Sequence, residues 1–513
     1  MAAAAEKFVV SVDVGTTNIK ACVYDKVGTI RGEAREEVSI ECPRPQWAEM
    51  DEERLWEAFQ SVTKKAVLNA SIGFENVACL GIATQRGTFI TWNKQTGKPL
   101  HKFICWHDLR CAELCKRWNS KLSLKALHAG GSFMHFFTKS NRFMAAKVLH
   151  FYPRMAISRL AWVLENIDEA KELAAEENLL FGTIDTWLLW KISAGRLHVT
   201  DYSNASSTGM YDPWKLEWSK LIFSLFKIPD GIAPKVEDTS QEFCVCPESL
   251  FGASFPISAI VADQQSSFFG NCCWARGDVK ITSGTGTFID VNTSTKPHAS
   301  MTGMLPLVGW KIKSEVVFVA EGQASATGKT VEWGRECGFY PTVEESSQVA
   351  KSVEDAGGVC FIPGFSGILV PFNDPKACCG ILGITPQTKP SHLARALLES
   401  IAFRIKQIFD TANTETVVKK TKIKIDGGIS TNDFVMQLVA DLTGCTVERQ
   451  SDHRDMTCFG AAMLAGLAVG FWSRDDLENF GQAKDTFTPQ RSQEAAYERW
   501  AKVVPRCLEW YAV

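Results

Sequence analysis

Two strand-turn-strand segments of similar pattern open the two halves of the chain. The first runs from Phe8 to Tyr24 and turns at Gly15-Thr16-Thr17, and the second runs from Val279 to Val291 and turns at Ser283-Gly284-Thr285-Gly286. Short apolar and β-branched runs on either side of a glycine turn predict hairpins. Their recurrence predicts a duplicated domain with a nucleotide held between the copies, although a similarity this short can also arise by chance.

The rest of the chain alternates between helical and strand-like apolar spacing. Residues 52–68 carry apolar side chains mainly at helical spacing, and residues 77–82 return to strand character. In the second half, His392–Phe409 is helical, and the strand Lys422–Ile425 follows it. This alternation predicts an α/β fold.

The chain has 513 residues, which is more than one hydrophobic core usually holds. We expect an N-terminal domain over 6–271 and a C-terminal domain over 277–472, with a boundary near Phe269–Gly277. The polar stretch 473–513 is expected to pack outside as an accessory helical segment.

The bulk composition points to a small-molecule partner. Charged residues make up 22% and the formal net charge is -3, so the chain as a whole lacks the basic excess that nucleic acids or anionic membranes select. The 17 cysteines are scattered and odd in number, which predicts reduced thiols in a cytoplasmic protein without a structural metal. The start of the chain does not resemble a signal peptide, and the longest apolar run, Ala461–Trp472, predicts a buried helix and no membrane span.

The first motif with chemical potential is Asp13-Val14-Gly15-Thr16-Thr17-Asn18. Glycine allows the backbone to approach a ligand, amide and hydroxyl groups can donate to phosphate oxygens, and Asp13 could hold Mg²⁺. A single motif of this kind is more often an ordinary hairpin turn. However, Gly284-Thr285-Gly286-Thr287 and Asp426-Gly427-Gly428 also follow strands, and the three together strengthen the prediction of a phosphate site.

A competing phosphate loop is Gly322 to Thr330, which ends in Gly328-Lys329-Thr330. A Walker A loop has four residues between its glycines, and this segment has five. The match is therefore interpreted as accidental, with Lys329 on the surface.

Asp263 follows an apolar strand-like run and could accept a proton from an attacking hydroxyl group. Spacing alone favours an ordinary helix N-cap for this residue. Arg86 and Trp106 also follow strand-like runs and could line a polyol pocket. For these two, a solvated Arg and a core Trp are the more common cases.

Taken in order, these motifs resemble the FGGY carbohydrate kinases, within them the glycerol kinases, and specifically the divergent glycerol kinase five subgroup. The similarity extends from about Lys7 to Trp472. The segments that carry it are Gln46-Trp47-Ala48-Glu49, Phe181-Gly182-Thr183-Ile184-Asp185-Thr186-Trp187, Thr200-Asp201-Tyr202-Ser203-Asn204-Ala205-Ser206, Ala262-Asp263-Gln264-Gln265, Leu398-Glu399-Ser400-Ile401-Ala402 and Ala465-Gly466-Leu467-Ala468-Val469-Gly470.

The resemblance implies an actin/hexokinase-like (ribonuclease H-like) duplicated fold, with the active site in the cleft between two domains that close over ATP and Mg²⁺. It also implies phosphorylation of a terminal polyol hydroxyl. The metal-associated carboxylate would be Asp13 and the general base Asp263. The implied substrate contacts are Arg86, Gly87, Trp106, Asp263, Gln264 and Phe288. The implied nucleotide contacts are Gly15, Thr16, Thr17, Lys20, Gly284, Thr285, Gly328, Glu332, Gly428 and Asn432.

Four positions depart from the glycerol kinase pattern. Gly87 replaces a Glu after the pocket Arg, residues 150–156 lack a clear pocket-Tyr motif, Glu332 replaces a Gln on the nucleotide side, and Lys20 replaces an Arg. Loss of hydrogen bonds of this kind costs on the order of 1–3 kcal/mol each, whereas the residues that transfer the phosphoryl group are retained. An altered or weaker kinase is therefore favoured over an inactive one.

Three hypotheses follow. The first is a glycerol kinase that makes glycerol 3-phosphate, the second a kinase for another small polyol or sugar, and the third a nucleotide-binding regulatory protein that signals to a protein partner. Retention of Asp13 and Asp263 argues against the third, because a binding module needs no base. A homo-oligomer is possible, and no protein partner is indicated.

Overall fold

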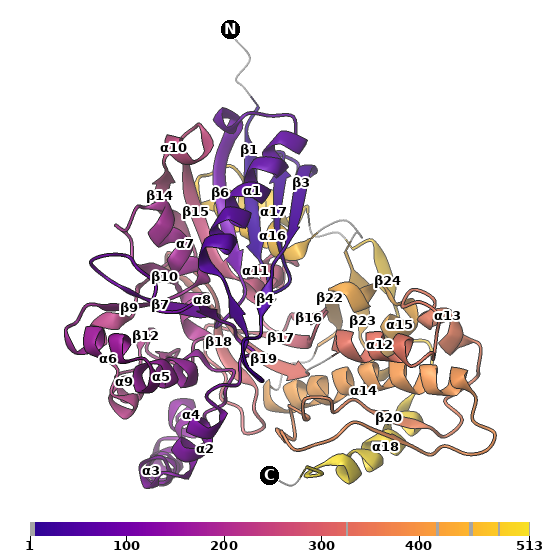
Figure 1. Cartoon of the computed structure of the whole chain (residues 1–513). Helices are drawn as coiled ribbons and strands as arrows, with labels where there is room; N and C mark the ends of the chain where they lie inside the picture. Colours follow the sequence, from indigo (N-terminus) through magenta and orange to yellow (C-terminus); the bar gives the residue numbers. More distant parts are fainter. Residues whose placement is uncertain (1–5, 325–326, 417–419, 451–454, 481–482, 512–513) are drawn as a thin grey trace.

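The computed structural model describes residues 6–324, 327–416, 420–450, 455–480 and 483–511. Within them the chain forms two lobes, each built around a mixed β-sheet covered by helices (Figure 1). The first lobe also carries a five-stranded sheet of order β4-β5-β8-β7-β9 and most of the short helices.

The first large sheet has the strand order β14-β15-β6-β1-β2-β3. Its first three strands in the chain are antiparallel neighbours, whereas β6 and β15 run parallel to β1. Central parallel strands are covered on both faces, and β1 accordingly reads as an almost continuous apolar run. The strands are β1 (Phe8–Val14), β2 (Asn18–Tyr24), β3 (Ile30–Glu37), β6 (Val77–Thr84), β14 (Ser240–Cys246) and β15 (Phe255–Ala262).

The second large sheet repeats this scheme in the order β18-β19-β17-β16-β22-β23-β24, with β18 added at one edge. Here too β16 and β17 form an antiparallel hairpin, β22 and β23 are parallel to β16, and the last strand is antiparallel. The matching topology supports the duplication that the two hairpins predicted. The strands are β16 (Val279–Ser283), β17 (Thr287–Ser294), β18 (Leu305–Ile312), β19 (Glu315–Ala324), β22 (Lys422–Asp426), β23 (Thr446–Arg449) and β24 (Asp485–Phe487).

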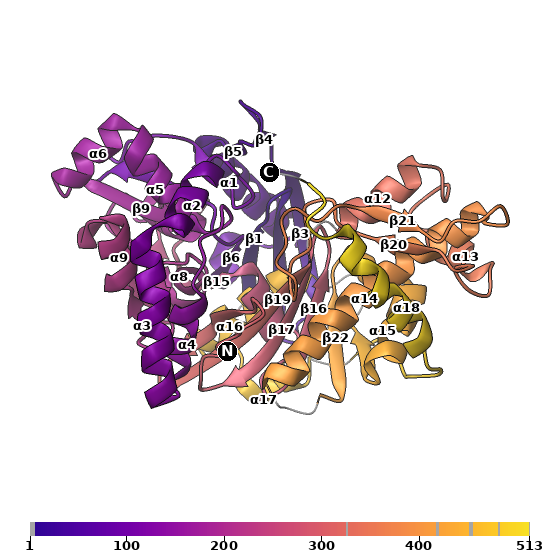
Figure 2. The ribbon, with the colours of Figure 1, turned by 90° about the horizontal axis from the view of Figure 1, so that it is seen from below.

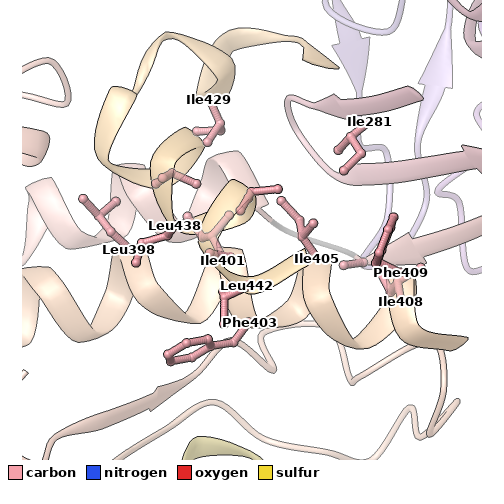
Figure 3. Close-up of a cluster of buried hydrophobic side chains, with 14 of the residues drawn as sticks. Ile281, Leu398, Ile401, Phe403, Ile405, Ile408, Phe409, Ile429, Leu438 and Leu442 are labelled. Atoms are coloured by element: carbon pink, nitrogen blue, oxygen red, sulfur yellow. The ribbon is translucent and has the colours of Figure 1, made fainter. Parts of the chain in front are cut away.

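One long helix covers a face of each sheet at an equivalent point of the chain. Helix α1 (Glu52–Asn69) lies between β3 and β6, and α14 (Pro390–Thr416) lies between β19 and β22. Figure 3 shows apolar side chains of α14 packed beside those of the sheet and of α15 (Asp433–Thr443). The labelled residues are Ile281, Leu398, Ile401, Phe403, Ile405, Ile408, Phe409, Ile429, Leu438 and Leu442.

Helix α16 (Met456–Ala468) comes from the second half of the sequence but packs against β1, β6 and β15 of the first sheet. It is the buried helix predicted from the run that begins at Ala461. It also crosses α11 (Asp263–Gly270) so closely that a Cβ on Gly460 would lie 1.8 Å from the Ser266 carbonyl oxygen. A packed core that also includes Trp310 and Val319 of the second sheet therefore joins the two lobes.

The C-terminal stretch is more than an outer helix. It contains α17 (Arg474–Glu478), the edge strand β24 and α18 (Glu494–Val503), and the Trp500 ring is buried in the core of the second lobe. No helix in the described part of the chain is long and apolar enough to cross a membrane.

The remaining elements are shorter. The strands are β4 (Ile40–Glu41), β5 (Glu49–Met50), β7 (Phe89–Asn93), β8 (Phe103–Ile104), β9 (Leu179–Thr183), β10 (Val199–Asp201), β11 (Tyr211–Asp212), β12 (Glu217–Trp218), β13 (Lys235–Glu237), β20 (Cys360–Ile362) and β21 (Gly380–Leu382). The helices are α2 (Ala112–Ser120), α3 (Leu122–Thr138), α4 (Asn141–Val148), α5 (Ala156–Asn166), α6 (Asp168–Ala175), α7 (Ile184–Ile192), α8 (Tyr202–Ser206), α9 (Lys220–Phe226), α10 (Glu248–Phe251), α12 (Thr327–Glu336) and α13 (Ser346–Lys351).

Candidate active site

The carboxyl ends of the parallel strands of both sheets point to one cleft, which is where open α/β sheets bind ligands. A cavity of about 570 Å³ lies there. It is lined by Thr16, Gln85, Arg86, Gly87, Trp106, Asp263 and Gln264 from the first lobe and by Thr282, Gly284, Thr285, Gly286, Phe288 and Gln323 from the second. Most of the residues expected at the substrate and at the phosphates are therefore brought together.

Asp263 is the first residue of α11, directly after β15. The N-cap of this helix is Ala262, so the N-cap interpretation of Asp263 is wrong. Its Oδ1 accepts a hydrogen bond of 2.7 Å from the Gln264 amide, and its side chain lines the cavity. Burial raises the pKa of Asp263 above its ordinary value, and the positive charge of Arg86 partly offsets that rise.

Arg86 connects the two lobes. Its Nε lies 3.5 Å from Asp263 Oδ1, and its Nη1 lies 2.7 Å from Glu321 Oε2 on β19. The guanidinium also lies 5.5 Å from the centre of the Phe288 ring. Only 12% of the Arg86 side chain is exposed, so this is not the solvated Arg that spacing alone would favour.

A chain of hydrogen bonds fixes Trp106 over the first phosphate loop. The indole Nε1 donates to Thr16 Oγ1 over 3.0 Å, and Thr16 Oγ1 donates to Gln85 Oε1 over 3.0 Å. Gln85 Nε2 in turn donates to the Gly15 carbonyl oxygen over 2.9 Å. Trp106 is thus a wall of the cavity and not simply a core residue.

Gly87 has φ of 70°, a left-handed conformation that glycine adopts without strain. A Cβ at this position would lie 3.5 Å from Arg159 Nη2 and 4.0 Å from Trp106 Cβ. The position where glycerol kinases are expected to carry Glu is therefore a backbone turn beside the Arg159 guanidinium.

Four residues of the segment 150–156 also line the cavity, namely His150, Tyr152, Arg154 and Met155. The Arg154 guanidinium lies 4.9 Å from the centre of the Tyr152 ring. Burial lowers the pKa of Arg154, as expected for a cation that is largely withdrawn from water. Arg154 was not among the predicted pocket residues, which in this segment were expected to follow a tyrosine motif.

The second phosphate loop is a tight turn whose Gly284 amide donates to the Gly286 carbonyl oxygen over 2.9 Å. The start of α12 supports it from behind, where the Gly328 amide donates to the Thr285 carbonyl oxygen over 3.3 Å. A Cβ on Gly328 would lie 2.8 Å from the Gly284 carbonyl oxygen, so this contact requires glycine. Lys329 is exposed on α12, which confirms its predicted surface position.

Asp13 is the penultimate residue of β1 and lies next to a cluster of negative charge. Its Oδ1 is buried and accepts no hydrogen bond from the described residues. Burial, followed by the carboxylates of Asp455 and Asp263, raises the pKa of Asp13 well above its ordinary value, while Lys20 lowers it. A buried carboxylate oxygen without a partner fits a cation ligand.

Lys20 is held by other side chains of the protein. Its Nζ lies 3.1 Å from Glu33 and 3.9 Å from Asp455. A phosphate contact by Lys20 would have to compete with these two carboxylates.

Beneath the substrate side lies a buried ion pair that the sequence analysis also missed. Lys280 Nζ lies 2.9 Å from Asp290 Oδ2 and donates to Gln264 Oε1 over 3.0 Å. Burial tends to lower the pKa of Lys280, but the nearby carboxylates of Asp290 and Asp426 outweigh it and raise that pKa. Lys280 therefore positions Gln264 from below.

Comparison with known proteins identifies the family. Residues 8–270 match the N-terminal domain of the FGGY family of carbohydrate kinases, and residues 279–469 match its C-terminal domain. The chain belongs to this family. The chain is 46% identical to glycerol kinase 5 of Danio rerio over 99% of its own length and 97% of that protein, and 36% identical to glycerol kinase 2 of Thermotoga maritima over 98% and 99%.

The fold agrees with this membership. The crystal structure of Plasmodium falciparum glycerol kinase with ADP aligns with a TM-score of 0.88 at 26% identity, covering 98% of each chain. The predicted resemblance and the predicted two-domain kinase fold are both confirmed.

In this FGGY kinase, seven of the ten predicted nucleotide residues do not line the cavity that holds Asp263, among them Asn432, Glu332, Gly428 and Thr17. Asn432 caps α15 by accepting from the Val435 amide and also donates to Ser346 Oγ over 3.1 Å, and Glu332 accepts from Arg335 Nε over 2.6 Å. At Gly428 a Cβ would meet open space. Thr17 is exposed at the first turn and accepts from Asn18 over 2.9 Å.

The structure adds Glu321 to the site. A carboxylate in the apolar interior of β19 was a usable signal for it, because a fully buried acid needs a partner.

Proposed function

We propose that this carbohydrate kinase transfers the γ-phosphoryl group of ATP to a terminal hydroxyl of a small polyol, with glycerol favoured and sn-glycerol 3-phosphate as the product. The names of the relatives and the ADP of the similar solved enzyme support the substrate and the nucleotide. The observation that carries the proposal is the position of Asp263, which shares one cavity with the phosphate loop Gly284–Gly286.

Asp263 acts as the general base. Its oxygen accepts the proton of the acceptor hydroxyl while the oxygen of that hydroxyl forms a bond to the γ-phosphorus and the bond to ADP breaks. Burial raises the pKa of Asp263 and makes its carboxylate a stronger base than an exposed Asp, and the positive charge of Arg86 favours the ionised form. Arg86, Trp106 and Gln264 orient the acceptor.

Mg²⁺ is proposed as the metal, with Asp13 as the protein carboxylate that holds it directly or through water. Among the described residues no group of three or more His, Cys, Asp or Glu could hold a metal alone. This suits Mg²⁺, which usually takes one or two carboxylates together with water and substrate phosphates. When bound, the ion neutralises negative charge on the transferring phosphoryl group.

The second candidate keeps this mechanism and changes the acceptor to a larger polyol or a sugar. It is favoured by the cavity volume of about 570 Å³, by Gly87, which supplies no side chain to the acceptor, and by Arg154, which supplies additional donors. The regulatory hypothesis is disfavoured because burial of a carboxylate such as that of Asp263 costs free energy. A protein that only binds nucleotide would gain nothing from this cost, whereas a kinase uses the carboxylate as a base. A homo-oligomer and a cytoplasmic location stay predictions.

The test is ADP release from Mg-ATP with glycerol and a panel of polyols and sugars, comparing the protein with Asp263→Asn. We expect a loss of about a hundredfold to ten-thousandfold in kcat, the usual contribution of a general base, with ADP binding retained. The matched control is Asp230→Asn, which removes an exposed carboxylate that does not line the cavity. Turnover on another acceptor would change the assigned substrate and keep the mechanism. Nucleotide binding without turnover on any acceptor would refute the kinase proposal and favour the regulatory hypothesis.

A further inference from the structure

Helix α3 exposes an apolar stripe along its outer face. Exposed apolar residues recur at helical spacing at Leu122, Ala126, Ala129, Phe133 and Phe137. The side chains are well exposed, at 80% for Leu122, 64% for Phe133 and 67% for Phe137. A stripe of this length extends along a helix of about 25 Å.

The C-terminal end of this stripe is a cluster of phenylalanine rings. The Phe133 and Phe137 ring centres lie 4.9 Å apart, and those of Phe136 and Phe137 lie 5.2 Å apart. The Lys139 ammonium lies 5.1 Å from the centre of the Phe136 ring. A positive charge therefore borders the apolar surface directly.

The opposite face of α3 already has its partner. Leu124 is buried, His128 Nε2 lies 2.8 Å from the Leu149 carbonyl oxygen, and Gly131 allows the backbone of α4 to approach so closely that a Cβ would lie 2.9 Å from the Lys147 amide nitrogen. Figures 1 and 2 both show α3 and α4 side by side, projecting from the first lobe. The outer stripe is thus not the core-facing side of the helix.

The charge around α3 is one-sided. Residues 114–164 contain nine lysines and arginines and no aspartate or glutamate, in a chain whose net charge is -3. Three of these cations pair with acids from outside this segment, Lys116 with Glu113, Arg117 with Glu165 and Arg142 with Asp212, and Arg159 is buried. The other exposed cations include Lys125, Lys139 and Lys147. The near-neutral total, which predicted no anionic membrane partner, conceals this local excess.

We propose that α3 docks on the surface of an anionic lipid bilayer. Phenylalanine and leucine on one face with lysines beside it is the pattern of helices that lie in the bilayer interface, where the apolar side chains enter the headgroup region and the cations attract acidic lipids. A second copy of this chain is a poorer occupant. A twofold interface through α3 would place Lys125, Lys139 and Lys147 of one copy near the same lysines of the other, where like charges repel.

The experiment is sedimentation of the full chain with vesicles of phosphatidylcholine alone and with vesicles that also contain phosphatidylserine. We expect binding to the acidic vesicles, weakened by salt, and little binding to the neutral ones. The triple variant Phe133→Ser, Phe136→Ser, Phe137→Ser should lose this binding, and Lys139→Glu should weaken it about fivefold or more. The matched controls are Ile384→Ser and Lys502→Glu, which change exposed residues elsewhere and should bind like the parent.

Because the serines replace exposed rings, the thermal midpoint of the triple variant should match that of the parent. The proposal is overturned if acidic vesicles do not pellet the protein at low salt, or if the Phe and Lys variants bind as well as the controls do. It is also overturned if the rings instead drive dimerisation of the chain in light scattering, or if only an acidic protein binds them. Vesicle binding needs no turnover, so its outcome is independent of the kinase proposal.

Discussion

The guanidinium of Arg86, just after β6, lies 2.7 Å from the carboxylate of Glu321 on β19. This contact joins the two lobes across the cleft at the point where Arg86 also faces Asp263. Glu321 is fully buried, so its charge acts in a medium that screens it weakly. The ionisation of the proposed base therefore depends on residues of both lobes.

Changes at this pair should move the pH dependence of turnover in opposite directions. The negative charge of Glu321 raises the pKa of Asp263, whereas Arg86 lowers it. A base must be ionised, so the acid limb of kcat/KM follows that pKa. Glu321→Gln should shift the limb to lower pH and Arg86→Gln to higher pH, measured with saturating nucleotide. Shifts of the same sign, or none, would contradict the assignment of the limb to Asp263.

Gly87→Ala should lower both stability and turnover. Because φ at this residue is 70°, an added Cβ costs about 1–2 kcal/mol in a left-handed conformation. The backbone would relieve that strain by moving Arg86 and Trp106, so the acceptor KM should rise. The thermal midpoint and acceptor kinetics measure the two effects. Gly252→Ala, at φ of 84° on a distant helix end, is the control: it should lower stability without changing KM.

Removal of the buried cation beneath Gln264 should destabilise the protein. Lys280→Met leaves Asp290 as an uncompensated buried carboxylate, which typically costs about 3–5 kcal/mol. The double variant Lys280→Met, Asp290→Asn should recover part of this loss, because the remaining side chain is neutral. Denaturant unfolding of the single and double variants checks the coupling. Equal stability of the two variants would show that the pair is not coupled.

The sequence predicted the strand ends of the site better than the side chains between them. Asp13 lies at the end region of β1, and Gly284 and Asp263 follow β16 and β15, all strands that the apolar pattern predicts. Parallel strands must bring such ends to one edge. The partners of Arg86 could not be predicted, because Glu321 lies more than two hundred residues away and on the other lobe. Pairing across lobes depends on tertiary packing, which leaves no periodic signal in a single sequence.

Two further features were not predicted from the sequence, namely the packing partner of α16 and the basic segment around α3. Helix α16 comes from the second half of the sequence but covers the first sheet, and hydrophobic spacing shows that a helix is buried without showing against what. The opposite holds for α3, where the net charge of the whole chain averages away a local basic segment. Windowed charge counts would have found it.

Asp13→Asn should make the protein more stable while it abolishes metal-dependent turnover. Burial and the carboxylates of Asp455 and Asp263 raise the pKa of Asp13 in the folded state, so the folded protein binds this proton more tightly than the unfolded chain does. The contribution of the Asp13 proton to the free energy of unfolding is therefore fully present below the pKa of the unfolded chain, near 3.9. It is lost as the pH rises through the pKa of Asp13 in the folded protein. Asparagine carries no charge to desolvate, so the variant should unfold at a higher temperature near neutral pH.

The gain should shrink as the pH falls, because Asp13 is then protonated in the parent as well. Thermal unfolding of the nucleotide-free protein over a pH series measures it, with the exposed Asp230→Asn as the control that should show no such trend. Addition of Mg²⁺ with ADP should reverse the order, because ligand binding stabilises a folded state that retains the metal carboxylate. Two results would refute the role of Asp13 as a buried carboxylate that binds the metal. One is an Asp13→Asn variant that is less stable than the parent at neutral pH, and the other is a variant that Mg²⁺ with ADP stabilises as much as the parent.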